Sequence, residues 1–162
     1  MTDHLLKIRK KNLRNSFCRF TEMEHRMESV AEYNKMLFIN DSKAQSVNAT
    51  YFALQSIDKP IIWIADGDDS ENDFSDLLPL VRLKVDAIIM LGKNNTKLYE
   101  TFKDSVESIY QVTNLWEAVW VAKEIGYKGT TVLFSPASKP NGEFTDYQER
   151  GLMFKKYVKE LV

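Results

Sequence analysis

Two apolar runs constrain the fold of this chain more than any other feature. Residues 61–64 (Ile-Ile-Trp-Ile) and 87–91 (Ala-Ile-Ile-Met-Leu) carry apolar side chains at every position, with no polar alternation. Strands of this kind are buried on both faces, as in a parallel sheet that has helices on each side. A segment that reads as a helix follows each run. The sequence therefore predicts an α/β domain of three layers.

The rest of the chain continues this alternation. Strands joined by helices of about ten residues or more form parallel β-α-β units, so we expect a mostly parallel sheet of about six strands. We also expect a hairpin turn at 34–35 and helix caps formed by Asn114 with Glu117 and by Thr145 with Gln148. The predicted strands are 28–33, 36–40, 60–65, 86–91, 107–112 and 130–134, and the predicted helices are 4–18, 44–56, 75–84, 95–102, 115–125 and 145–161.

Composition excludes several classes of protein. The chain has 162 residues, which fit one domain, and its net charge of −1 gives no reason to expect a nucleic-acid partner. The basic stretch 7–14 is interpreted as the solvated face of a helix. No apolar run reaches the length of about 18 residues that a membrane span needs. Cys18 is the only cysteine, which excludes an internal disulfide and makes a cytoplasmic setting the default.

An acidic loop invites comparison with a calcium site. The pattern Asp66-x-Asp68-x-Ser70 begins like an EF-hand loop. Its sixth position is Glu71 where that loop needs glycine, and its twelfth is Leu77 where it needs glutamate. We therefore expect no dedicated metal site.

The polar turn after residues 36–40 is the best candidate for a binding site. The strand runs into Asp41-Ser42-Lys43, and a helix is expected to begin at once. Open α/β sheets bind ligands beyond the carboxyl ends of their strands. A lysine at a helix start would also lie where free N–H groups already attract anions.

Three segments together resemble the Mur ligase family. They are Glu24-His25-Arg26-Met27-Glu28, the turn 41–44, and the pair 135–137 and 144–151 near the carboxyl end. Their order and spacing are most similar to the members that add D-glutamate during peptidoglycan synthesis. The resemblance implies a Rossmann-like C-terminal domain at 25–162, with residues 1–24 resembling the last helix of the family's central domain and a linker. In the full family, ATP and magnesium activate a UDP-muramoyl carboxylate for attack by an amino acid.

Family roles transfer where residues match. The resemblance implies a nucleotide-contacting arginine, an acid that accepts hydrogen bonds from ribose hydroxyls, and a lysine near the phosphates. It also implies a serine-containing substrate loop and an aromatic residue near the amino acid. The implied nucleotide-binding residues are Arg26, Asp41 and Lys43, and the implied substrate-binding residues are Ser135, Ser138 and Tyr147.

Each of these residues also has a simpler interpretation. Arg26 can pair with Glu24 or Glu28. Asp41 and its neighbour Ser42 can be plain helix caps. The lysine at 43 can be a solvated side chain, and the tyrosine at 147 can belong to the core.

Several departures from the family bear on activity. Gln45 replaces a threonine that helps to hold the substrate, Ser70 replaces a lysine that meets the glutamate carboxylate, and Pro140 replaces a serine that contacts the substrate. Proline has neither a hydroxyl nor a backbone N–H. The phosphate-binding loop is also absent: residues 92–94, Gly-Lys-Asn, come closest, but the hydroxyl for magnesium is missing.

Two functional hypotheses follow. In the first, the chain is the amino-acid-presenting domain of a D-glutamate-adding ligase and has no catalytic residues, cofactor or metal of its own, so it depends on UDP-binding and ATPase domains as partners. In the second, it is a free-standing binding module that descends from such a ligase and recognises a protein, an amino acid or a nucleotide. An unrelated nucleotide-binding α/β domain is a third alternative, which fold analogy alone permits.

Overall fold

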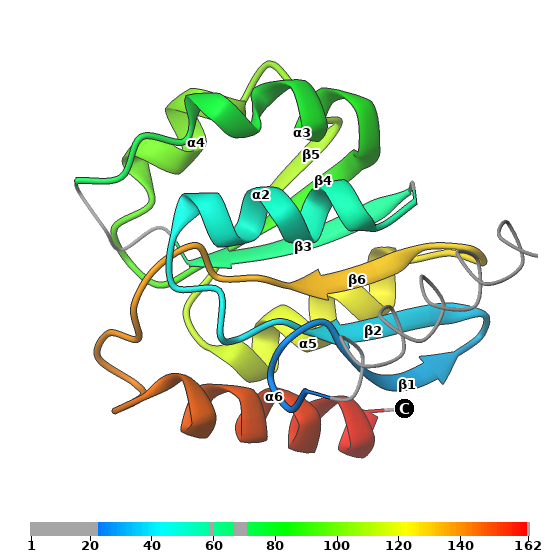
Figure 1. Cartoon of the computed structure of the whole chain (residues 1–162). Coiled ribbons are helices and arrows are strands. Elements are labelled where there is room, and N and C mark those ends of the chain that lie inside the picture. Colours follow the sequence, from blue (N-terminus) through cyan, green and yellow to red (C-terminus); the bar gives the residue numbers. More distant parts are fainter. Residues whose placement is uncertain (1–22, 59, 67–70, 162) are drawn as a thin grey trace, which may run out of the picture.

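A computed structural model describes residues 23–58, 60–66 and 71–161 (Figure 1). Six strands alternate with helices along the chain. The strands are β1 (Glu28–Tyr33), β2 (Met36–Asn40), β3 (Ile61–Asp66), β4 (Val85–Leu91), β5 (Ser108–Val112) and β6 (Thr131–Phe134). The helices are α2 (Val47–Ser56), the 3₁₀ turn η1 (Ser75–Leu77), α3 (Leu78–Lys84), α4 (Thr96–Phe102), α5 (Leu115–Ile125) and α6 (Tyr147–Leu161).

The strands form one sheet in the order β1-β2-β6-β3-β4-β5. Only β1 is antiparallel, paired with β2 through the hairpin turn at Asn34 and Lys35, which have φ angles of 49° and 63°. The other pairs are parallel. The predicted three-layer, mostly parallel α/β fold is confirmed. Because β6, the last strand, inserts between β2 and β3, the segments that follow these three strands lie side by side.

Helices cover both faces of the sheet (Figure 1). Ile62 and Ile64 of β3 pack in the core under α5 and α6, whereas Ile61, Trp63 and Ala65 pack under α2, α3 and α4. Every residue of β3 is buried. This two-sided burial is the physical reason why the strand carries no polar alternation.

The start of α2 differs from the prediction. The helix begins at Val47, not at residue 44, and Ser46 caps it by accepting a hydrogen bond from the Ala49 N–H at 3.2 Å. The backbone of Ala44 serves the preceding loops instead: its N–H donates to the Asp41 carbonyl, and its carbonyl accepts from Ala137. The polar turn is therefore a separate structure and not the first turn of the helix.

Helix caps were predicted correctly at α5 and wrongly at α6. Asn114 accepts from the Glu117 N–H at 2.9 Å, as expected. At α6 the cap is Asp146, which accepts from the Glu149 N–H at 2.7 Å. The Glu149 carboxylate reaches back to the N–H of Thr145 at 2.8 Å. The capping pair is thus one residue later than predicted. The predicted helix 4–18 and the domain boundary at 24/25 fall on or beside residues outside the described ranges and stay predictions.

Candidate functional site

The two patches that the sequence separates by about a hundred residues meet at one edge of the sheet. This edge holds the carboxyl ends of β2, β6 and β3, where Asp41, Ser135 and Asp66 lie. The Ser135 hydroxyl donates to Asp41 Oδ2 at 2.8 Å. Lys43 Nζ lies 5.9 Å from the centre of the Tyr147 ring. Two residues of the predicted nucleotide group therefore each contact one residue of the predicted substrate group.

Asp41 is almost completely buried, with 4% of its surface exposed. Its second oxygen, Oδ1, accepts from the Met27 N–H at 3.2 Å. Burial raises the pKa of this carboxyl from 3.8 to about 6, although the Ser135 hydroxyl, the Met27 N–H and the positive charge of Arg26 lower it. Each carboxylate oxygen has two lone pairs, so both can accept a further hydrogen bond. The site thus holds an acceptor whose charge changes near neutral pH.

Ser135 is fully buried and anchors the loop after β6. Its carbonyl accepts from the Trp63 indole at 2.8 Å. Its hydroxyl lies 2.9 Å from the Thr50 hydroxyl. Because the Ser135 hydroxyl has one proton and donates it to Asp41, Thr50 is the donor in this pair. In this structure Ser135 orients Asp41, and its predicted contact with substrate stays a prediction.

The loop before β1 places Arg26 beside Asp41. His25 and Met27 have positive φ angles of 67° and 47°, which bring the loop back against the end of β2. Arg26 is exposed, and its charge acts on Asp41. Glu24 and Glu28, the partners in the simpler interpretation of Arg26, both accept from Lys155 of α6, at 2.8 and 3.1 Å.

Lys43 and Tyr147 form the outer rim of the site. Lys43 is exposed and lies in the turn after β2, not at a helix start, so the predicted effect of the helix N-terminus on this lysine is wrong. Tyr147, the first residue of α6, is half-buried and also contacts the His25 ring edge-on, with the ring centres 6.0 Å apart. The helix-cap interpretation of Asp41 and Ser42 is also wrong, because Ser46 caps α2.

Sequence reasoning missed Arg150, which lies behind the site. Its side chain is fully buried. One guanidinium nitrogen, Nη2, donates to the carbonyl of Ser42 at 2.9 Å and to the carbonyl of Ser138 at 3.0 Å. The other terminal nitrogen, Nη1, lies 3.7 Å from Asp66 Oδ2. The helical spacing of Arg150 with Phe154 and Val158 is the sequence signal that could have predicted its burial.

Asn40 is a second residue that the sequence did not single out. Its buried amide donates to Glu28 at 3.0 Å, lies 3.1 Å from His25 Nδ1, and its oxygen accepts from the Ser42 N–H at 3.1 Å. Burial lowers the pKa of His25, which favours a neutral ring whose Nδ1 accepts from Asn40. This amide joins the loop before β1 to the turn after β2.

Two of the positions that depart from the family lie next to segments of this cluster in the chain: Gln45 follows the turn after β2, and Pro140 follows the loop 135–138. Both side chains are half-buried. Ser138 is buried, and its carbonyl accepts a hydrogen bond from Arg150. Ser70 lies outside the described residues.

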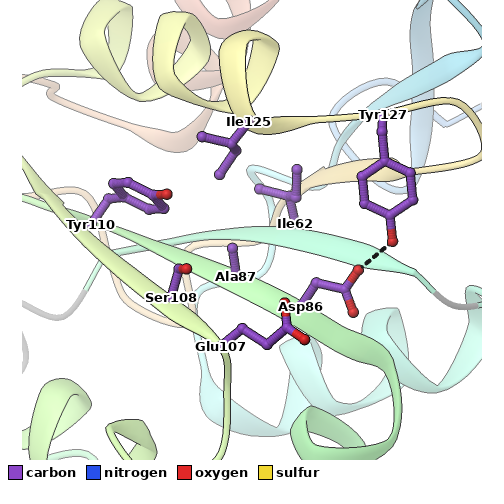
Figure 2. A pocket seen from close by; sticks show the side chains of 8 residues that line it. All are labelled: Ile62, Asp86, Ala87, Glu107, Ser108, Tyr110, Ile125 and Tyr127. Carbon is purple, nitrogen blue, oxygen red and sulfur yellow. Dashed lines mark hydrogen bonds between the residues drawn. The ribbon is translucent and has the colours of Figure 1, made fainter.

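Two cavities lie elsewhere on the domain. The first, about 310 Å³, is at the opposite edge of the sheet, where Tyr127 donates to Asp86 at 2.5 Å (Figure 2). Its other lining residues are Ile62, Ala87, Glu107, Ser108, Tyr110 and Ile125. The second, about 320 Å³, lies between α4 and the ends of β4 and β5 and includes Lys93, Asn95 and Tyr99. Neither cavity includes any of the six predicted site residues.

The chemistry of this edge suits binding better than covalent catalysis. It offers a buried acceptor in Asp41, exposed cations in Arg26 and Lys43, and an aromatic face in Tyr147. Across the described ranges, no group of three or more metal-ligating side chains is close enough to hold an ion. In the same part of the chain, no helix has both the length and the hydropathy of a membrane span.

Comparison with known proteins identifies the family. The family model described as "Mur ligase, glutamate ligase domain" matches residues 25–138. The chain belongs to the Mur ligase family. The match covers the loop before β1, the turn after β2 and the start of the loop after β6. These segments build most of the edge described above, whereas Tyr147 and Arg150 of α6 lie outside the matched residues.

Individual relatives agree with this assignment. The chain is 44% identical over 161 residues to a UDP-N-acetylmuramoylalanine–D-glutamate ligase from Christiangramia forsetii, and 40% identical over 159 residues to one from Bacteroides fragilis. These alignments cover 99% and 98% of this chain but only 36% of each relative. The chain therefore spans about a third of the curated relatives it matches.

Solved structures support the fold. A UDP-N-acetylmuramate–alanine ligase from Thermotoga maritima aligns over 88% of this chain and 31% of that protein, with a TM-score of 0.57. The sequence identity is 16%, so this likeness shows the fold alone.

Proposed function

We propose that this chain is the amino-acid-presenting domain of a D-glutamate-adding Mur ligase in peptidoglycan synthesis, acting in the cytoplasm. The curated relatives that match nearly all of this chain are named UDP-N-acetylmuramoylalanine–D-glutamate ligases. Such a domain contributes binding groups to a reaction whose activating step needs ATP and magnesium held by other domains. The missing phosphate-binding loop supports this division of labour.

The observation that carries the proposal is the hydrogen bond between Ser135 and Asp41. It joins the loop that we assign to the amino acid with the acid that we assign to the nucleotide. A ligase needs both ligands at one site, because ATP activates the carboxylate that the amino acid then attacks, and orientation of the reacting groups supplies much of the rate enhancement in such reactions. The contact of Lys43 with Tyr147 joins the same two groups at the rim.

Each residue has a distinct role in this proposal. Asp41 accepts hydrogen bonds from ribose hydroxyls, and Arg26 contacts the nucleotide because a guanidinium both stacks on a base and forks onto oxygens. Lys43 faces the phosphates. Tyr147 and Ser138 contribute to the amino-acid side, with Ser135 fixing the loop.

A reconstitution experiment tests the proposal. The chain is mixed with the first two domains of the Christiangramia forsetii ligase, ATP, magnesium, D-glutamate and UDP-N-acetylmuramoylalanine, and phosphate release is followed. We expect no turnover from the chain alone and turnover from the mixture. Lys43→Met should abolish turnover, whereas the exposed Lys156→Met control should not. Turnover by the chain alone, or none from a mixture that forms a stable complex, contradicts the proposal.

A second candidate function is a binding module without catalysis. Gln45 and Pro140 favour it, because both positions have lost a hydroxyl that contacts substrate in the family. Isothermal titration with ADP, ATP, D-glutamate and a cationic amino acid separates the two. Nucleotide or D-glutamate binding supports the ligase domain, and binding of the cationic amino acid alone supports a pocket with changed specificity. No binding at all favours a role in protein interaction.

A further inference from the structure

We infer that Arg150 is the positioning residue of this site, holding the turn after β2 and the loop after β6 in register with each other. This inference rests on the proposed function for its consequence in ligand binding, but its structural part does not. The relevant segments are the turn 41–44 and the loop 135–138.

The geometry of Arg150 suits this role. Its Nη2 group donates to the carbonyl of Ser42, in the turn, and to the carbonyl of Ser138, in the loop. One nitrogen therefore joins two segments that are almost a hundred residues apart in sequence. Ser42 precedes Lys43, and Ser138 closes the loop that begins with Ser135. A shift of Arg150 would move the amino-acid side of the site relative to the nucleotide side.

The energetics indicate that stability alone does not explain Arg150. Its Nε and Nη1 groups have no hydrogen-bond partner among the described residues, although the side chain is fully buried. Within the same ranges, the hydroxyls of Ser42 and Ser138 are also unpartnered. Buried polar groups without partners destabilise a folded protein, and a well-packed apolar side chain often replaces a buried ion pair without loss. The pair with Asp66, at 3.7 Å, is long for a strong hydrogen bond.

The side chain is nevertheless held as a cation. Burial lowers the pKa of Arg150 to about 10, and Asp66 opposes this shift, so the guanidinium is charged at neutral pH. Its central carbon lies 6.0 Å from the centre of the Phe134 ring, within the distance of a cation–π interaction. A planar guanidinium can reach two carbonyls from a fixed position, which the single ammonium of lysine does less well.

Hydrogen exchange tests the inference without any ligand. The amide of Lys43 donates to the His25 carbonyl, and the amide of Ala137 donates to the Ala44 carbonyl. In Arg150→Met we expect both amides to exchange at least ten times faster, and in Arg150→Lys we expect a smaller increase. The matched control is Lys84→Met at the opposite edge of the sheet, where this lysine donates to the carbonyls that end α2. The control should lower the melting temperature and leave the rates of these two amides unchanged.

Ligand titration adds a functional measurement. We expect Arg150→Met to weaken nucleotide or D-glutamate binding at least tenfold, and Lys84→Met to leave it unchanged. If Arg150→Met and Lys84→Met change the exchange rates and the ligand affinity equally, Arg150 has only a structural role and the inference is wrong. If the wild-type chain binds no ligand, the proposed function fails while the exchange rates still decide the inference. If neither Arg150 variant folds, the exchange rates of the wild-type protein decide. Segments that Arg150 holds together should open together, so opening rates of the turn 41–44 and the loop 135–138 that differ by more than a hundredfold would overturn the inference.

Discussion

Replacement of Asp41 by asparagine should remove a pH-dependent cost from the folded state. The asparagine side chain would keep the shape of the aspartate and an oxygen that can accept from the Met27 N–H. It cannot ionise. In the wild-type protein the carboxyl is buried, and its pKa is raised to about 6 from the ordinary value of 3.8.

The sign of the effect follows from proton binding. Between about pH 4 and pH 6 the folded protein keeps a proton on Asp41 that the unfolded chain has already lost. Unfolding then releases a proton, so the free energy of unfolding falls as pH rises through this window. The difference between the two pKa values corresponds to about 3 kcal/mol, at about 1.4 kcal/mol for each pH unit. This loss is complete well above the folded pKa of about 6 and absent below the unfolded value of 3.8.

Urea denaturation between pH 4 and pH 8 measures the effect. Relative to the wild type, Asp41→Asn should gain about 2.5 kcal/mol of stability on going from pH 4 to pH 7, whatever its offset at pH 4, because the unfolded carboxyl is already partly ionised at pH 4. That offset reflects the Ser135 hydroxyl, which must turn to accept from the new amide. The exposed variant Asp146→Asn is unsuitable as a control because Asp146 caps α6, so Asp76→Asn in η1 serves instead. A parallel pH dependence of wild type and Asp41→Asn would refute the reasoning.

Three further results are expected. If Asp41 holds the ribose, nucleotide affinity should fall about tenfold between pH 7 and pH 5 as the carboxyl gains its proton, and titration calorimetry at the two pH values would contradict this by finding equal affinity. Gly151→Ala should destabilise the domain by about 1–2 kcal/mol in urea, because the new Cβ would clash with His25 Nδ1 and Ser42 Oγ, and a stabilised variant would mean that helix propensity outweighs this clash. Asn114→Ala should cost about 1 kcal/mol through loss of the α5 cap, with Asn48→Ala on the exposed face of α2 as the control, and equal melting temperatures would contradict the assigned cap.

Much of the fold followed from local patterns. The runs at 61–64 and 87–91 predicted buried parallel strands, and residues 34–35 predicted the hairpin between β1 and β2. Helix caps were harder to predict, because several polar residues in a row can each serve as the N-cap of the same helix. Thr145 and Asp146 compete in this way, and Asp146 caps the helix. At the start of α2, the backbone of Ala44 forms hydrogen bonds with Asp41 and Ala137, so the helix begins only at Val47.

The sequence by itself determined the layered α/β class, the strands and the family resemblance, because apolar periodicity and short motifs are properties of neighbouring residues. Only the tertiary structure decided the strand order, which inserts β6 between β2 and β3 and so brings Ser135 to Asp41. It also decided which groups the buried guanidinium of Arg150 contacts, namely the carbonyls of Ser42 and Ser138. Burial of a charge depends on what packs around it, and those partners come from segments that no local pattern joins.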